Sequence, residues 1–401
     1  MGNSLDNFPQ ILERTRQNDP KLTHVHFIFQ TLTKHELKLF LEASKGNTSI
    51  QVMNLAKQNL GNCPKGMYFL SEYLKVTKTL QHLDLFDNNL GNCIEGMNSL
   101  LEALKVNKTL QGLSLKRNNL GNCPEWLISL SETLKVNKTL QVLELGDNNL
   151  GNSREGLSSL SEALKVNDTL QELGLIDNNL GNCPEGVISL TESLGVNKSL
   201  RELSMVGNNI GGNCPDWLFS LSETLKDNKT LQKLSLGYNN LGNCPEGVIS
   251  LSESLKVNNT LRELGLDNND LGNCPDPSGV KYLSEALKVN NTLEELWLNG
   301  NNLGKCPEGV NSLSEALKVN NTLKELWLNH NNIGDCHGGS ILFLESLKIN
   351  SSIQKLWING NKFDKTVLDE INHILLRNIH NNLLKNCCLF GLLLPVLDSS
   401  F

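Results

Sequence analysis

The sequence lacks the features that mark several common classes of protein. No stretch of its 401 residues approaches the roughly 20 consecutive apolar residues of a membrane-spanning helix. The polar start, MGNSLDNFPQILERTRQNDP, has no apolar core and so does not predict a secretory signal. The formal net charge is −7, and this overall field does not favour nucleic acid or an anionic membrane as a partner. We therefore expect a cytoplasmic protein, acting in its own cell or in a host cell into which it is delivered.

Motifs of catalysis are missing as well. The chain has no G-x-x-x-x-G-K-[ST] phosphate-binding loop. Its serine and threonine hydroxyls recur in segments such as SLSEAL, too regularly to predict a nucleophile. His24 and His26 are expected on one face of a strand, but a metal site needs a further ligand, so we interpret them as solvated side chains. The sequence predicts no enzyme activity, no metal and no cofactor.

The cysteines form no CxxC pair, although there are eleven of them. Most share one position of a repeat, at Cys63, Cys93, Cys123, Cys183, Cys214, Cys244, Cys274, Cys306 and Cys336. A ladder of metal sites or disulfides is one interpretation, and a small buried residue at the entry to a helix is the other. Ser153 holds the same position in the remaining repeat, which favours the second interpretation. Reduced thiols are expected in a chain without a secretory signal.

The chain is organised around a repeated stretch, best seen at residues 170–199. Its first part follows the pattern L-x-x-L-x-L-x-x-N-x-L, the leucine-rich-repeat signature. Leu173 and Leu175 alternate with polar or small residues, which predicts a short strand with one buried face. Pro184 then suits the first turn of a helix, and the apolar spacing that follows is helical. Asn197 closes the segment as a left-handed cap.

Stacked copies of this unit can bury the apolar faces that one copy leaves open. Most copies are 30 residues apart. We predict an α/β fold, a right-handed leucine-rich-repeat solenoid (horseshoe) with a parallel β-sheet on the concave face and α-helices on the convex face. Residues 1–21 are expected to form an N-terminal helical cap, residues 22–378 about 12 repeats, and residues 379–401 a C-terminal cap or tail.

Two columns of asparagine accompany the repeat. The signature column is expected to be buried and to bond backbone groups of the next unit; it comprises Asn88, Asn118, Asn148, Asn178, Asn208, Asn239, Asn269, Asn301, Asn331 and Asn361. The second column forms N-x-[ST] sequons at the helix ends, such as Asn107, Asn137 and Asn167. We interpret these as capping residues, which would carry glycans only in a different compartment.

The signature, the long unit with a full helix, and strands such as ELWLNGNN resemble the ribonuclease-inhibitor subclass of leucine-rich repeats. That subclass includes the repeat domains of NLR immune receptors and the GTPase activator of Ran. The resemblance covers about residues 22–380 and implies a horseshoe that binds proteins, although such scaffolds host many roles. The chain departs from the activator in lacking a long acidic tail. Residues 18–50 also resemble the opening repeat of tropomodulin, which implies a capping segment.

Between the two signature leucines of each strand lies a side chain expected to face the concave wall. This column reads Asn54, Asp84, Ser114, Glu144, Gly174, Ser204, Ser235, Gly265, Trp297, Trp327 and Trp357. Adjacent strands lie about 4.8 Å apart, so the three indoles should form one ladder. They either stack only on one another or anchor a partner; we favour binding, because soluble proteins rarely expose a large apolar face without a function. Trp126 and Trp217, at helix starts, are expected near the outer rim.

We predict a non-catalytic scaffold that binds a partner protein on the concave face and is itself a monomer. The partner-binding residues are Trp297, Trp327, Trp357, Glu295, Glu325, Asn299, Asn329, His330 and Tyr238. The acidic lean of this set favours a partner with a basic surface. The alternatives are a regulator of an enzyme, as activator of a small GTPase or as inhibitor, and a membrane-associated adaptor held by the C-terminal tail, with Cys387 and Cys388 as acylation candidates.

Overall fold

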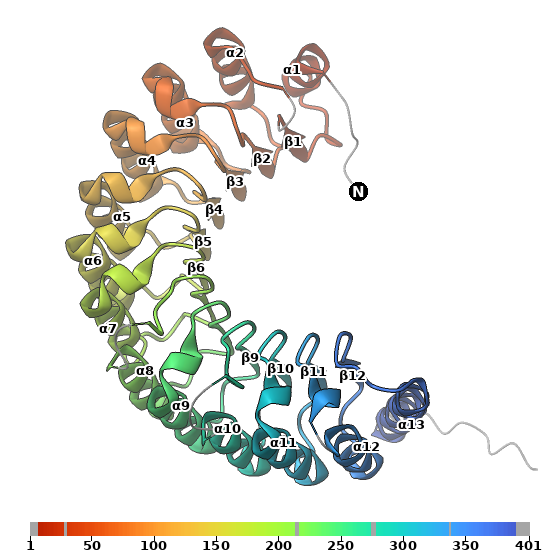
Figure 1. Ribbon diagram of the computed structural model, residues 1–401. Coiled ribbons are helices and arrows are strands. Elements are labelled where there is room, and N and C mark those ends of the chain that lie inside the picture. Colours follow the sequence, from red (N-terminus) through yellow and green to blue (C-terminus); the bar gives the residue numbers. More distant parts are fainter. Residues whose placement is uncertain (1–6, 28–29, 213–215, 274–277, 337, 390–401) are drawn as a thin grey trace, which may run out of the picture. The chain divides into compact units, whose positions relative to one another are not determined.

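The computed structural model describes residues 7–27, 30–212, 216–273, 278–336 and 338–389 (Figure 1). The chain forms two compact units, an N-terminal unit (Met1–Asn240) and a C-terminal unit (Leu241–Phe401). Within each unit, three-residue strands alternate with helices along the chain, and the helices stand on one side of the strands (Figure 1). Each unit is therefore a solenoid of strand–helix repeats, as the periodicity predicts.

The N-terminal unit contains eight described strands paired in parallel in chain order, each in register with the next. These are β1 (His24–His26), β2 (Val52–Asn54), β3 (His82–Asp84), β4 (Gly112–Ser114), β5 (Val142–Glu144), β6 (Glu172–Gly174), β7 (Glu202–Ser204) and β8 (Lys233–Ser235). Its helices are α1 (Phe8–Arg16), α2 (Lys34–Ser44), α3 (Pro64–Val76), α4 (Ile94–Val106), α5 (Pro124–Val136), α6 (Arg154–Val166), α7 (Pro184–Ser193) and α8 (Asp216–Asp227).

The C-terminal unit repeats the pattern with β9 (Glu263–Gly265), β10 (Glu295–Trp297), β11 (Glu325–Trp327) and β12 (Lys355–Trp357). Its helices are α9 (Pro245–Val257), α10 (Ser278–Val289), α11 (Pro307–Val319), α12 (Gly339–Ile349) and α13 (Lys365–Leu389). Short 3₁₀ helices follow many strands, at Leu60–Asn62, Leu90–Asn92, Leu120–Asn122, Leu150–Asn152, Leu180–Asn182, Leu241–Asn243, Leu303–Lys305 and Ile333–Asp335.

The core lies between the strands and the helices. In the repeat that begins at Leu170, Leu173 and Leu175 are buried, whereas Glu172, on the opposite face of the strand, is partly exposed. Pro184 occupies the first turn of α7, where its missing N–H removes no helical hydrogen bond. The predicted alternation, the helix start and the parallel pairing of the strands are confirmed.

The signature asparagines are fully buried and link each repeat to the one before it. Asn148 donates from Nδ2 to the carbonyl oxygen of Leu115 at 2.9 Å, and its Oδ1 accepts the N–H of Asn118 at 2.8 Å. The predicted burial is confirmed, but the predicted direction was wrong, because the groups that Asn148 satisfies belong to the preceding repeat. The reason is geometric: the amide lies at the bend after the strand, beside the open backbone of its predecessor.

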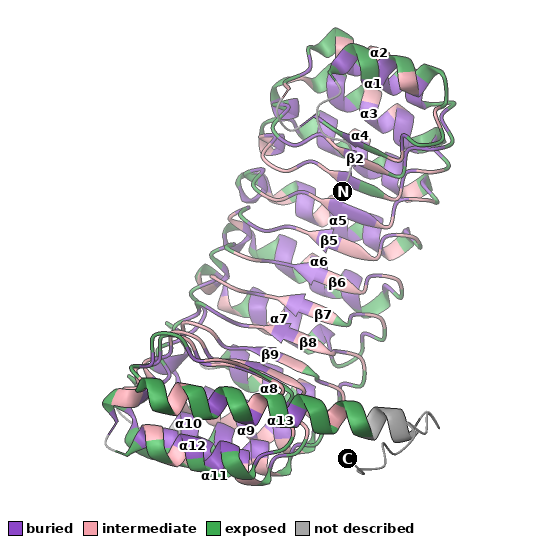
Figure 2. Cartoon of the chain, turned by 90° about the vertical axis from the view of Figure 1, so that its right-hand side faces the viewer, coloured by how far each residue is buried: buried purple, intermediate pink, exposed green. Residues whose placement is uncertain are grey.

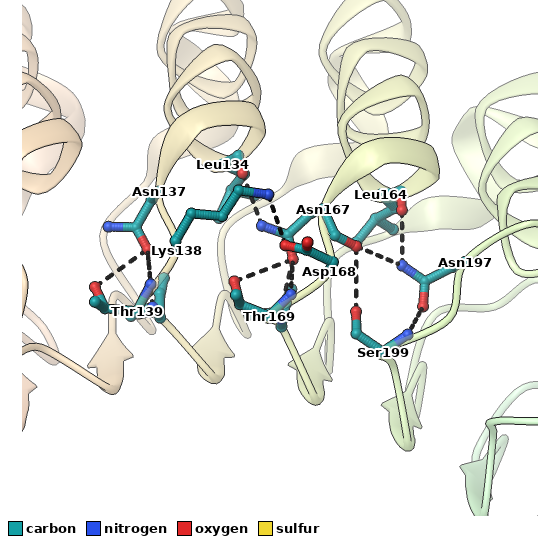
Figure 3. A network of polar contacts seen from close by, with 12 residues as sticks. Leu134, Asn137, Lys138, Thr139, Leu164, Asn167, Asp168, Thr169, Asn197 and Ser199 are labelled. Carbon is teal, nitrogen blue, oxygen red and sulfur yellow. Dashed lines mark hydrogen bonds and ion pairs between the residues drawn. The ribbon is translucent and has the colours of Figure 1, made fainter.

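The second asparagine column also bonds backward, as Figure 3 shows. Asn167 donates to the carbonyl oxygen of Leu134, at the end of the preceding helix, and its Oδ1 accepts the N–H of Leu170, both at 2.7 Å. Its backbone is extended at φ −75°, so the left-handed cap predicted for this column was wrong. The left-handed residues lie instead before the 3₁₀ helices, as at Asn149 with φ 59°. Because the Nδ2 of Asn167 is bonded and its side chain is buried, the sequon offers no site for a glycan.

The buried interpretation of the cysteine column is supported by the structure. The described cysteines are free thiols and nearly all are buried at the residue before a helix. Burial raises the pKa of the Cys183 thiol, which disfavours the reactive thiolate. Trp126 and Trp217 were predicted near the outer rim, and that prediction was wrong. Both are buried, and their Nε1 groups donate to the carbonyl oxygens of Leu120 and Ile210, in the segments between strand and helix.

A helix lies at each end of the described chain. In α1, Phe8, Ile11 and Leu12 are buried. In α13, Ile371 and Asn378 are buried, while its outer side is largely exposed (Figure 2). This helix continues through residue 378, where the sequence placed the start of the tail. Residues 390–401 and the side chains of the two candidate acylation cysteines, Cys387 and Cys388, lie outside the described part. No helix among the described residues has both the length and the apolar character needed to cross a bilayer.

Candidate partner-binding surface

Three tryptophans stand side by side on the strand face of the C-terminal unit. The strand register aligns Trp297 with Trp327, and Trp327 with Trp357. In β10, the leucines on either side of Trp297 are buried in the core, so the alternation of the strand turns the indole to the opposite face. All three indoles are only partly exposed. The predicted ladder is therefore present as an arrangement of side chains.

The rings form a graded stack. Trp327 and Trp357 are nearly parallel, with centroids 3.6 Å apart and planes inclined by 12°. Trp297 is tilted by 55° from Trp327, at a centroid distance of 5.8 Å. The Nε1 of Trp327 is buried and has no hydrogen-bond acceptor among the described residues. The stack thus presents one tightly packed pair of rings and a third that is set more loosely beside it.

The charged residues beside the indoles are partly paired with one another. Lys355 contacts the carboxylate of Glu325 at 2.6 Å, and this hydrogen bond raises the pKa of Lys355. At the strand entrances, Glu294 contacts both Arg262, at 2.6 Å, and Lys324, at 2.5 Å. These contacts neutralise much of the acidic rim that the sequence predicts around Glu295 and Glu325, so the attraction for a basic partner is weaker than the residue types suggest.

Asn299 and Asn329 hold neighbouring turns together. Oδ1 of Asn299 accepts the backbone N–H of Asn329, and Oδ1 of Asn329 accepts that of Asn359, both at 2.8 Å. The series begins at Asp267, which accepts both the backbone N–H and the Nδ2 of Asn299 at 2.8 Å. Sequence reasoning assigned these amides to recognition and missed this ladder. The signal for it was the column itself, which places Asp or Asn after the strand in four successive repeats.

The two remaining predicted residues lie at loop tips. His330 is exposed, has a left-handed backbone with φ 57°, and its ring lies against Gly360 of the next repeat. Tyr238 has the same loop position and the same φ, with 59% of its surface exposed, but it belongs to the N-terminal unit. The candidate surface therefore comprises the three indoles, the Glu325–Lys355 pair and His330, whereas Tyr238 belongs to the other unit.

The first-strand histidines lie in the N-terminal unit, with stacked rings 6.2 Å apart. Burial and then the neighbouring His24 lower the pKa of His26. Within the described residues, no group of three His, Cys, Asp or Glu side chains is arranged to hold a metal ion.

Asp267 is the one charged member of the described amide ladder, and burial of its ionised carboxylate lowers the stability of the folded state. Burial raises the pKa of this carboxyl above its ordinary value of 3.8, although the two N–H groups of Asn299 oppose the shift. The folded protein therefore holds this proton more tightly than the unfolded chain. The stability from this group is complete below pH 3.8 and is lost as the pH rises through the raised pKa.

We expect Asp267→Asn to raise the free energy of unfolding by about 1 kcal/mol near neutral pH, because asparagine keeps the acceptor oxygen without the buried charge. The gain should vanish at about pH 3, where the aspartate is protonated in both states. Urea unfolding measured at both pH values tests this. Asp270→Asn, at an exposed position where other repeats have asparagine, is the matched control and should change stability by less than about 0.5 kcal/mol. An equal gain in the control would contradict the assignment to burial.

Comparison with known proteins agrees with this geometry. A family described as "Leucine Rich repeat" matches residues 78–92, 136–161, 227–252 and 319–335, and a second, "Leucine Rich Repeat", matches residues 199–221 and 292–313. Each of those segments contains one strand of the repeat, and the longer ones reach into the helix that follows it. The chain is a leucine-rich repeat protein.

Among solved structures, this leucine-rich repeat protein is similar to LegL7 of Legionella pneumophila, a leucine-rich repeat-containing protein. The two share 18% identity, with 86% of this chain and 99% of that chain covered and a TM-score of 0.54. At that identity the likeness shows the fold alone. The tropomodulin C-terminal domain of Caenorhabditis elegans aligns with 51% of this chain at 16% identity, covering 97% of its own length, with a TM-score of 0.31, which is too low to support an argument. No curated protein matches the leucine-rich repeat chain in sequence.

Proposed function

We propose that this leucine-rich repeat protein is a non-catalytic scaffold that binds a partner protein on the strand face of its C-terminal unit, with Trp297, Trp327 and Trp357 as anchors. Leucine-rich repeat folds generally serve protein–protein interaction. The observation that carries the finer proposal is the stack of three partly exposed indoles on one face of three successive strands.

The energetic argument rests on apolar area. A tryptophan side chain buries roughly 150–250 Å² when it is fully covered. Because the rings already cover part of one another, a partner gains less than the full area, but it meets a surface whose side-chain entropy has already been lost. Tryptophan is also among the residues most enriched at the energetic centres of interfaces. A flat apolar or aromatic element of the partner is the natural complement.

The surroundings of the stack set its specificity. At the strand and entrance positions around it, Glu263, Glu294, Glu295 and Glu325 face Arg262, Lys324 and Lys355, which leaves one net negative charge. Such a mixed rim favours a partner with alternating charges over a strongly basic one. Full-length helices in every described repeat also support placing the chain in the ribonuclease-inhibitor-like subclass.

The test replaces all three indoles with serine. Serine is a matched choice because Ser114, Ser204 and Ser235 occupy the same position in other repeats of this chain, so the fold accommodates it there. Partners recovered by affinity purification with the wild-type protein are identified and their dissociation constants measured by calorimetry. We expect the triple variant to bind at least about 100-fold more weakly, as the loss of several anchor residues predicts.

The control variant changes three apolar side chains on the strand side of the N-terminal unit, Phe86→Ser, Ile176→Ser and Val206→Ser, which are also partly exposed. It should retain wild-type affinity. Circular dichroism and urea midpoints confirm that both variants are folded. Unchanged binding by the tryptophan variant, or an equal loss in the control, would reject the C-terminal strand face as the docking site.

A further inference from the structure

A second polar surface lies in the N-terminal unit, at the edge where the strands begin. The turns that lead from each helix into the next strand line an open trough of about 550 Å³. Three successive turns each contribute one lysine, one threonine and one glutamine to its walls, for example Lys78, Thr79 and Gln81, and the next turn has Asp168 in place of the lysine. The trough therefore presents the same set of donors several times along a line.

The lysines of this trough form a row of like charge. Lys78, Lys108 and Lys138 are exposed and occupy equivalent positions of successive repeats. Because their turns lead into strands about 4.8 Å apart, the three ammonium groups stand close enough to repel one another in the free protein. Only Lys138 has an anionic partner among the described residues, Asp168 at 2.6 Å, shown in Figure 3. A ligand with regularly spaced negative charge would relieve this repulsion.

The trough also holds polar groups without partners. The hydroxyl oxygens of Thr79 and Thr109 are buried and have no hydrogen-bond partner among the described residues. The side-chain amides of Gln81 and Gln111 make no hydrogen bond within the described part of the chain. An amide both donates and accepts, which matches the alternating N–H and C=O groups of a peptide backbone. The combination fits a chain that carries both backbone amides and carboxylates.

The same edge of the C-terminal unit differs, although its repeats are built alike. There a trough of about 630 Å³ has Asn291 and Asn321 where the N-terminal unit has lysines. Its two cations, Arg262 and Lys324, both contact the carboxylate of Glu294, at 2.6 and 2.5 Å. The row of three lysines, of which Lys138 alone is paired among the described residues, is thus a local property of the N-terminal unit and not a requirement of the repeat.

We propose that the N-terminal trough binds an extended acidic segment of a partner protein, with Lys78, Lys108 and Lys138 contacting its carboxylates and Gln81 and Gln111 its backbone. Single-stranded nucleic acid is the other polyanion that could follow such a row. Proteins that bind it stack its bases on aromatic side chains, and no aromatic residue lines the described trough. This surface is separate from the tryptophan stack, so the inference stands independently of the function proposed above.

The experiment measures the binding of a labelled peptide of alternating glutamate and serine to the 401-residue chain by fluorescence anisotropy. About eight residues suffice, because five strands span about 19 Å and an extended residue covers about 3.3 Å. Saturable binding that weakens with added salt is expected. In the variant with Lys78→Gln, Lys108→Gln and Lys138→Gln, affinity should fall about tenfold or more, as the loss of three exposed ion pairs predicts.

The matched control is Lys75→Gln, Lys105→Gln and Lys135→Gln, which removes the same charge from the helices three residues earlier, where each lysine pairs with a glutamate. It should leave affinity within about twofold of wild type. Asp168→Asn should tighten binding, because it releases Lys138. No peptide binding, an equal loss in the control, or tighter binding of an oligothymidylate probe of the same length would overturn the proposal.

Discussion

Replacing Gly151 with alanine is expected to lower the free energy of unfolding by about 3–5 kcal/mol, because the added methyl group would overlap backbone atoms of the next repeat. Gly151 lies in the 3₁₀ helix Leu150–Asn152, directly against the next repeat. A Cβ there would overlap the carbonyl oxygen of Asn179, with the carbonyl carbon 2.6 Å away. Both atoms belong to the backbone, so no side-chain rotation relieves the clash, and the two repeats must separate.

Urea unfolding followed by circular dichroism measures this loss. Gly46→Ala is the control, since a Cβ at Gly46 meets no atom within 4 Å, and its stability should stay within about 0.5 kcal/mol of wild type. Wild-type stability in Gly151→Ala would show that the repeats can move apart at this contact at little cost, contrary to the close packing described here.

Asn148→Ala is expected to lower the free energy of unfolding by about 3–4 kcal/mol, since it leaves several buried backbone groups without a hydrogen-bond partner at once. The amide of Asn148 donates to the carbonyl oxygens of Leu115 and Leu145 at 2.9 Å and accepts the N–H groups of Asn118 and Leu120. Alanine satisfies none of these, and the site is fully buried, so water does not replace the lost partner.

Asn152→Ala provides the comparison within the same repeat. Asn152 is exposed and its side chain makes no hydrogen bond among the described residues, so the change should be below about 0.5 kcal/mol. Thermal and urea unfolding should show a loss of unfolding free energy several-fold larger for Asn148→Ala than for Asn152→Ala. Similar values would mean that the buried amide column contributes little to the stacking of repeats.

Much of the fold was predictable because the same sequence pattern recurs in successive repeats. In each repeat, leucines spaced by two residues define the strand, and apolar residues spaced by three or four define the helix. The assignment made for one repeat therefore holds for the others. The signature asparagines were correctly placed in the core for the same reason. What the pattern does not contain is direction: whether Asn148 serves the repeat before or after it depends on the path of the turn, which spacing alone does not encode.

The residues around the candidate site were harder to assign. The Trp297 column was predictable from strand alternation, since period two is robust in a short strand. Asn299 and Asn329 were predicted to form a recognition rim because they follow the strand and are polar, but their side-chain Oδ1 atoms accept backbone N–H groups of the next turn. Trp126 and Trp217 stand at helix starts where other repeats have glycine. The hydrogen bonds that accompany their burial join residues six and seven positions apart, which the repeat pattern does not predict.

The backward reach of the asparagine side chains has a consequence for synthesis on the ribosome. The N–H of Asn118 donates to the side chain of Asn148, 30 residues later, and the carbonyl oxygen of Leu134 accepts from the side chain of Asn167, 33 residues later. These backbone groups of each repeat therefore lack their partners from the protein until its successor has emerged. A nascent chain always has one unfinished turn at its growing end, and every new repeat completes the one made before it.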